Sequence, residues 1–126
     1  MAGKILIIED DKDLAMVLAM RLSKAGFEVR TAQDAALGVK EAHQFKPNLI
    51  ILDLMLPAGG GFAVMERLKL STHTNQIPIF ILTGTGDDKA KQTAMDLGAQ
   101  KLISKPYEFD QLLADITKIV PLTPSS

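Results

Sequence analysis

Three short runs of consecutive apolar residues constrain the fold more than any other feature of this sequence. They cover residues 5–8, 49–52 and 79–82, are rich in isoleucine, and are bounded by polar or turn-forming residues. A strand that is buried on both faces has such a continuous run, whereas a half-exposed strand alternates apolar and polar residues. We therefore expect three central strands of a parallel sheet, with two weaker strands over residues 27–31 and 101–104.

Apolar residues at helical spacing fill the segments between these strands. The predicted helices carry residues 14–22, 37–45, 62–68, 90–97 and 109–119. Asp34 and Asp87 stand where N-caps of the second and fourth helices are expected, and Gly26 and Gly98 stand where the first and fourth helices should end. The apolar positions of the first helix are Leu14, Val17, Leu18 and Leu22.

Strands and helices thus alternate five times along the chain. Parallel strands need crossover connections, which are right-handed. We expect an α/β domain of the flavodoxin-like type, with five helices covering both faces of one doubly wound, five-stranded parallel sheet. We choose the strand order 2-1-3-4-5, which periodicity alone does not establish. Residues 1–120 are expected to form this domain, and residues 121–126 a flexible tail or linker stub.

Composition excludes several classes of function. The 126 residues suit one domain, and the lack of cysteine excludes disulfides and thiolate metal sites. Fourteen basic and fifteen acidic residues leave a net charge of -1, so the sequence lacks the excess of positive charge that direct nucleic-acid binding needs. No apolar run approaches the ~20 residues of a membrane span, and no signal peptide is visible. We expect a cytoplasmic protein without a nucleic-acid or membrane partner.

Polar residues whose side chains can bind ligands or take part in reactions follow four of the five predicted strands. They are Glu9, Asp10 and Asp11 after the first, Asp53 after the third, Thr83 after the fourth, and Ser104, Lys105 and Pro106 after the fifth. Ligands of open α/β sheets bind outside the carboxyl ends of the strands, near the point where the strand order reverses. Because these four strands are neighbours in the chosen order, we expect the side chains to converge there.

Such a cluster of carboxylates favours a bound cation, since the negative charges otherwise repel one another. Mg²⁺ prefers oxygen ligands and keeps several waters. An aspartate beside Mg²⁺ and a lysine can attack a phosphoryl group, whose charge the metal and Lys105 would neutralise and to which Thr83 could donate a hydrogen bond. Taken singly, each residue has a simpler interpretation: Asp10 and Asp11 as helix caps, and Asp53 and Thr83 as turn residues. Their joint placement favours a phosphoryl-transfer site.

Residues 3–119 resemble the response-regulator receiver family of two-component signalling systems. Four motifs carry the resemblance: IIEDD at residues 7–11, ILDLMLP at residues 51–57, LTG at residues 82–84 and SKPY at residues 104–107. The resemblance implies these roles: Glu9 and Asp10 as an acidic Mg²⁺ pair, Asp53 as phosphoacceptor and metal ligand, the Met55 backbone carbonyl as a further metal ligand, Thr83 as switch hydroxyl, and Lys105 as phosphate-binding lysine. It also implies a cis Lys105–Pro106 bond.

The implied function is a switch that accepts a phosphoryl group from a histidine kinase or histidine phosphotransfer protein and then acts on a downstream effector protein or domain. The chain departs from the family at Leu102, where many members carry a mobile aromatic switch residue, and at Gly60, where an acidic residue is common. Gln100 and Lys101 replace an acidic pair through which one DNA-binding subfamily dimerises. We therefore expect Thr83 and the loop of residues 84–86 to report phosphorylation more strongly than Leu102.

Three other functions compete with this interpretation. A degenerate receiver would bind partners without phosphorylation, but the acidic pair, Asp53, Thr83 and Lys105 are all present. An aspartate-nucleophile phosphatase of the haloacid dehalogenase type needs a second aspartate at the position of Met55. A flavodoxin-like electron carrier needs a flavin-binding loop, which we do not find. We therefore expect a phosphoacceptor signalling domain that catalyses only its own phosphotransfer and dephosphorylation. His43 and His73 lie away from the strand ends and are expected at the surface.

Overall fold

The computed structural model of the chain describes residues 2–84 and 87–122. The strands are β1 (Lys4–Ile8), β2 (Glu28–Ala32), β3 (Leu49–Asp53), β4 (Ile79–Thr83) and β5 (Lys101–Ser104). The helices are α1 (Lys12–Ala25), α2 (Ala35–Phe45), α3 (Gly60–Lys69), α4 (Asp88–Asp96) and α5 (Phe109–Ile119), with a 3-10 turn, η1 (Pro57–Gly59), before α3. The predicted alternation of strands and helices is confirmed.

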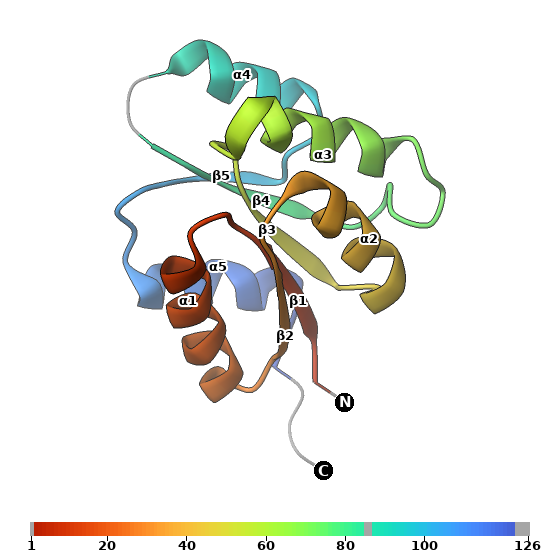
Figure 1. Cartoon of the computed structure of the whole chain (residues 1–126). Coiled ribbons are helices and arrows are strands. Elements are labelled where there is room, and N and C mark those ends of the chain that lie inside the picture. Colours follow the sequence, from red (N-terminus) through yellow and green to blue (C-terminus); the bar gives the residue numbers. More distant parts are fainter. Residues whose placement is uncertain (1, 85–86, 123–126) are drawn as a thin grey trace.

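The strands form one parallel sheet in the order β2-β1-β3-β4-β5, as predicted. Helices α1 and α5 cover one face, and α2, α3 and α4 cover the other (Figure 1). The strand order reverses between β1 and β3, because the chain passes from β1 to β2 on one side and then crosses back to β3. The carboxyl ends of these two central strands therefore form a crevice between the flanking connections.

The core consists of two apolar layers, one on each face of the sheet. Alternate residues of each strand point to opposite faces, so Leu6 and Ile8 pack toward α2 and α3 whereas Ile5 and Ile7 pack toward α1 and α5. All residues of β3 and β4 are buried. This burial on both faces explains why the central strands have continuous apolar sequences.

Aspartate caps and glycine stops set the ends of the helices as predicted. Asp34 accepts a hydrogen bond from the Leu37 amide, and Asp87 accepts one from the Ala90 amide. Gly26 ends α1 in the left-handed region, at a φ of 113°. This conformation is costly for a residue with a Cβ atom, which is why glycine suits the position.

Two expected details differ in the structure. β2 covers residues 28–32 instead of 27–31, because the Phe27 amide donates to the Leu22 carbonyl and so still closes the last turn of α1. In α1, Leu18 and Leu22 are buried, but Leu14 and Val17 are more than half exposed. The buried side of α1 is completed by small alanines instead.

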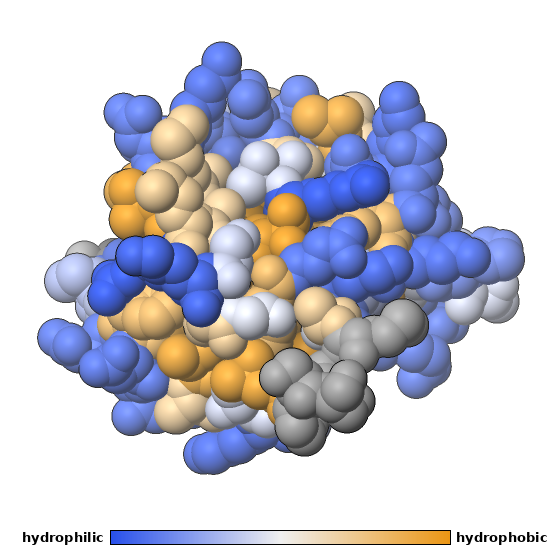
Figure 2. Space-filling view, turned by 90° about the horizontal axis from the view of Figure 1, so that it is seen from below, coloured by the Kyte–Doolittle hydropathy of each residue, from blue (hydrophilic) through white to orange (hydrophobic). Residues whose placement is uncertain are grey.

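The surface combines apolar and charged areas. Figure 2, seen from below, shows apolar surface bordered by hydrophilic side chains on the side where β1 begins. His73 is exposed as expected, whereas His43 is half-buried, and their rings pack edge to face with centroids 6.4 Å apart. Among the described residues, no helix has the length and apolar character needed to cross a membrane.

Candidate functional site

The register of the sheet brings Glu9 and Asp53 together. Ile8 of β1 pairs with Leu52 of β3, so the next residue of each strand emerges at the same place. Asp53 also pairs with Leu82 of β4. The side chains of Glu9 and Asp53 are only 4% and 6% exposed. Two carboxylates are thus buried side by side at the switch point of the sheet.

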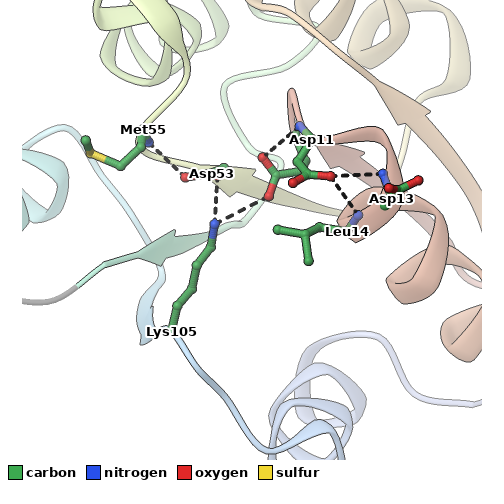
Figure 3. Close-up of polar contacts among 7 residues, drawn as sticks. Asp11, Asp13, Leu14, Asp53, Met55 and Lys105 are labelled. Carbon is green, nitrogen blue, oxygen red and sulfur yellow. Dashed lines mark hydrogen bonds and ion pairs between the residues drawn. The ribbon is translucent and has the colours of Figure 1, made fainter.

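Lys105 comes to these carboxylates from the other side of the crevice. Its amide donates to the Thr83 carbonyl at 2.8 Å, which holds the start of the β5–α5 loop beside β4. The Lys105–Pro106 peptide bond is cis, as the resemblance implies. The Nζ atom lies 2.8 Å from Asp53 Oδ2 and 3.4 Å from Glu9 Oε1 (Figure 3). One ammonium group therefore bridges both buried carboxylates.

Both carboxylate oxygens of Asp53 accept hydrogen bonds. Its Oδ1 atom accepts a hydrogen bond from the Met55 amide at 2.9 Å, while its Oδ2 atom faces Lys105 (Figure 3). The Met55 side chain points into solvent, since it is 71% exposed. The carboxylate is therefore oriented by a backbone donor and a charged donor, with no acidic side chain at the position of Met55 to act as a proton donor.

Glu9, Asp10 and Asp53 fit a hard cation. One carboxylate oxygen from each lies within 4.8 Å of the others. Glu9 and Asp53 are buried whereas Asp10 is exposed, so the group opens to solvent at one side. Carboxylate oxygens with room for water suit Mg²⁺, which keeps much of its hydration shell in proteins. The donor set thus agrees with the predicted metal, and the role of the Met55 carbonyl stays a prediction.

Burial and mutual contact shift the pKa values of the two buried carboxyl groups in opposite directions. Burial, followed by the hydrogen bond and charge of Asp53, raises the pKa of Glu9 from 4.5 to about 7. Burial also acts to raise the pKa of Asp53, but hydrogen bonds with Glu9 and Lys105 outweigh it and lower that pKa below 3.8. For Lys105, burial opposes the charge, but the hydrogen bond to Asp53 raises the pKa. Asp53 is therefore the ionised member of the pair.

Asp11 has the capping role that its position suggested. Its Oδ1 atom accepts hydrogen bonds from the Asp13 and Leu14 amides and so caps α1. Its own amide donates to Glu9 Oε2 at 3.4 Å (Figure 3). The first turn of α1 is thus tied to the site, and Asp10 is left with its carboxylate at the opening.

In the loop after Asp53, two stretches of backbone lie very close together, which the sequence did not indicate. Ala58 and Gly59 both have left-handed backbones, with φ values of 58° and 70°. The loop then returns so closely that a Cβ atom on Gly61 would lie 2.4 Å from the Leu54 carbonyl oxygen. Leu54 directly follows Asp53, so Gly61 supports the backbone that positions the buried carboxylate.

We expect Gly61→Ala to destabilise the protein. Alanine favours a helix over glycine by about 1 kcal/mol, but the clash is with backbone that cannot rotate away, and overpacking costs about 1–3 kcal/mol or more. Urea unfolding should therefore show a net loss of stability. Gly84→Ala is the matched control, because a Cβ atom there meets nothing within 4 Å. Equal stability of the Gly61 variant and the wild type would contradict this account.

Thr83 and Leu102 lie on the same face of the sheet, because side chains alternate along a strand and Leu102 pairs with Ile81, two residues before Thr83. The buried Thr83 hydroxyl donates to the Gly84 carbonyl at 3.2 Å and makes no bond to Asp53. Leu102 is half-buried and packs in the apolar layer on the α4 side. Thr85 and Gly86, to which we assigned part of the switch, lie outside the described residues.

Comparison with known proteins identifies the family. The family model "Response regulator receiver domain" matches residues 5–117. The chain is 37% identical to the DNA-binding dual master transcriptional regulator RpaA of Synechocystis and 32% identical to the phosphate regulon transcriptional regulatory protein PhoB of Escherichia coli. Each alignment covers 95% of this chain and 50% or 52% of the relative. The chain therefore spans about half the length of these curated relatives.

Solved structures agree. The chemotaxis response regulator CheY4 of Vibrio cholerae superposes with a TM-score of 0.86 at 25% identity, covering 95% of this chain and all of the other. The receiver domain of a signal transduction histidine kinase from Syntrophus aciditrophicus gives 0.86 at 26% identity, covering 99% and 98%. With the matched family model and the observed strand order, these results show that the chain belongs to the response-regulator receiver domain family.

Proposed function

We propose that this receiver accepts a phosphoryl group on Asp53, in a Mg²⁺-dependent reaction, and thereby switches protein–protein interactions. The observation that carries the proposal is the placement of Asp53, buried beside an acidic pair and 2.8 Å from the Lys105 ammonium. A carboxylate that must attack a phosphoryl group needs to be ionised, and Asp53 has the lowered pKa of the pair. Lysine and carboxylates then face the same opening, where a phosphate group can enter.

In the proposed reaction, an oxygen of Asp53 attacks the phosphorus of the donor. The new oxygen–phosphorus bond forms as the donor's bond to phosphorus breaks, and the departing group leaves with the bonding electrons. Lys105 is within hydrogen-bond distance of the attacking carboxylate and can then pair with a phosphoryl oxygen. Glu9, Asp10, Asp53 and the Met55 carbonyl would hold Mg²⁺, which supplies positive charge against the phosphoryl oxygens.

The proposed switch begins at Thr83. Among the described residues, its hydroxyl bonds to the neighbouring Gly84 carbonyl, a contact that a phosphoryl oxygen could replace. Movement of Thr83 would first affect α4, which packs on the same apolar layer as Leu102. Because Leu102 lacks a ring, we assign it a smaller part in the switch. The two states need to differ by only a few kcal/mol for phosphorylation to shift the population.

We propose that a histidine kinase or histidine phosphotransfer protein donates the phosphoryl group. The phosphorylated domain then acts on a downstream effector protein or domain, and we place all of these proteins in the cytoplasm. Leu14 and Met55, both exposed and apolar, flank the opening to Asp53 and offer the donor a contact surface. We assign residues 1–120 to the receiver unit and 121–126 to a tail. The signalling unit itself would contact neither nucleic acid nor membrane. The two curated relatives named above are transcriptional regulators, and RpaA is a DNA-binding one.

Two alternatives have less support. A receiver that works without phosphorylation has no use for a lysine bridging two buried carboxylates, an arrangement that costs desolvation energy. A phosphatase of the aspartate-nucleophile type needs a general acid where Met55 exposes a thioether.

The experiment that tests the proposed function is phosphoryl uptake from acetyl phosphate, followed by intact-protein mass. With Mg²⁺ we expect the mass to rise by one phosphoryl group. With a chelator we expect little or no uptake, because the buried carboxylates would repel the incoming phosphate. No uptake in either buffer, or equal uptake in both, would contradict a Mg²⁺-dependent receiver.

A further inference from the structure

The open edge of the sheet has features that phosphoryl transfer does not use. β2 pairs with β1 and with no other strand of the described chain (Figure 1). In a parallel pair, a residue directs both its backbone groups to the same neighbour, and its successor directs both away. The Glu28 amide donates to the Gly3 carbonyl, and the Ala32 carbonyl accepts from the Glu9 amide. Val29 and Thr31 therefore direct their amide and carbonyl groups outward.

A groove runs between this edge and α1. It has a volume of about 1000 Å³ and is lined by Met16 and Met20 of α1 and by Val29 and Thr31 of β2, among others. Met16 and Met20 are 59% and 62% exposed. Of the nine large hydrophobic residues that the described chain exposes, four are in α1. A free strand edge thus lies next to an apolar surface that the fold itself leaves uncovered.

The charge around this groove is mainly positive. Its charged lining consists of Lys12, Arg21, Lys24, Arg30 and Glu41. The one carboxylate is already paired, because Arg30 lies 3.1 Å from it. Arg30 also lies over the Phe45 ring, 4.7 Å from its centroid, and so is held against α2 instead of covering the edge of β2. Arg21 is held in the same way over the Phe109 ring, 4.1 Å from its centroid, so Lys12 and Lys24 are the lining cations that remain to attract negative charge.

We propose that β2 and the α1–β2 groove bind an extended, acidic segment of a partner protein, which adds a strand beside β2. Backbone pairing with Val29 and Thr31 would supply affinity, as in other cases of strand addition. Alternate apolar side chains of the segment would lie on Met16, Met20 and Val29. Its carboxylates would face Lys24 and the other cations of the groove, which selects acidic segments. A second copy of this chain fits less well, because it would bring the same cations into the groove.

The test uses the whole chain, isotope-labelled, and a blocked synthetic peptide of alternating valine and glutamate, about six to eight residues long to match a strand. Added peptide should shift the amide signals of Met16, Met20, Val29 and Thr31. It should also slow hydrogen exchange of the outward amides of Val29 and Thr31, while leaving that of Arg30, which faces β1, unchanged.

Met20→Glu should weaken this binding about tenfold or more, because it removes apolar contact and repels the peptide. Met95→Glu is the matched control, an exposed methionine of α4 outside the groove, and should not change binding. Lys24→Glu gives a second variant that tests the charge alone. Equal binding of a valine–lysine peptide, an equal loss in the Met95 variant, or signal changes centred elsewhere would overturn the proposal. So would protection of Val29 and Thr31 by self-association without peptide.

Discussion

Asp53→Asn is expected to abolish stable phosphorylation by acetyl phosphate, with no gain in mass where the wild type gains one phosphoryl group. Asparagine matches the size of aspartate and keeps an oxygen for the Met55 amide. It has no anionic oxygen to attack phosphorus. Glu9 and Asp10 do not substitute for it, because the proposed function commits both carboxylates to Mg²⁺. The loss should therefore be complete instead of partial.

The matched control is Asp11→Asn. Asp11 is adjacent in sequence to the acidic pair, but its carboxylate caps α1, and asparagine is an equally good cap. This variant should fold and take up one phosphoryl group like the wild type. Circular dichroism should show that both variants keep the native helix content. Phosphorylation of the Asp53 variant, or its loss in the Asp11 variant, would show that the acceptor has been assigned to the wrong residue.

The sheet could be predicted from sequence because its central strands are buried on both faces. The apolar runs at residues 5–8, 49–52 and 79–82 each lie within one residue of the observed strands. β2 was shifted by one residue, since Phe27 looks like a strand residue in sequence but closes the turn of α1. Apolar character alone does not distinguish these two roles, because in both the ring is buried.

Helical spacing was a poorer guide to what is buried. In α1, Leu14 and Val17 share the apolar spacing of Leu18 and Leu22 yet face solvent. The buried side is completed by Ala15, which gives little signal in a pattern because it is small. Exposed apolar residues that serve binding are thus indistinguishable in sequence from core residues, and the groove beside β2 became visible only in three dimensions.

The convergence of acidic residues and Lys105 followed from sequence because all of them stand at strand ends. The hydrogen-bond partners of the site residues could not be predicted from the sequence. The Met55 amide donates to Asp53, and the Thr83 hydroxyl turns to Gly84, although neither contact has a sequence signature. The contact of Gly61 with Leu54 has no sequence signature either, because it depends on the path of the whole loop.

Mg²⁺ binding is expected to weaken sharply below neutral pH, and the cause is Glu9. Its pKa of about 7 means that it holds a proton below that pH, and the metal must displace this proton. The apparent affinity should therefore fall about tenfold between pH 8 and pH 6 and about 100-fold between pH 8 and pH 5, following one proton. Asp53 adds nothing to this slope, because its lowered pKa keeps it ionised throughout the range.

Glu9→Gln separates this proton effect from other causes. The variant should bind Mg²⁺ more weakly at pH 8 but with little dependence on pH between 6 and 8, as measured by titration calorimetry.

The stability of the metal-free protein should also depend on pH differently in the variant. In the wild type, the unfolded chain releases the Glu9 proton near pH 4.5 while the folded chain keeps it up to about 7, so stability falls as pH rises through this window. The stabilising effect of the lowered Asp53 pKa is lost only below 3.8, outside the window.

The size of this loss is at most about 3.5 kcal/mol, from the shift in the Glu9 pKa from 4.5 to about 7 at about 1.4 kcal/mol per pH unit. The glutamine variant lacks the proton and should therefore be more stable than the wild type at pH 8 without Mg²⁺, by about 1–3 kcal/mol in urea unfolding. Added Mg²⁺ should stabilise the wild type more than the variant, because it binds the folded form more tightly there. A wild-type Mg²⁺ affinity that stays constant from pH 8 to pH 5 would show that Glu9 is ionised without the metal, and that the buried pair holds its charge through Lys105 alone.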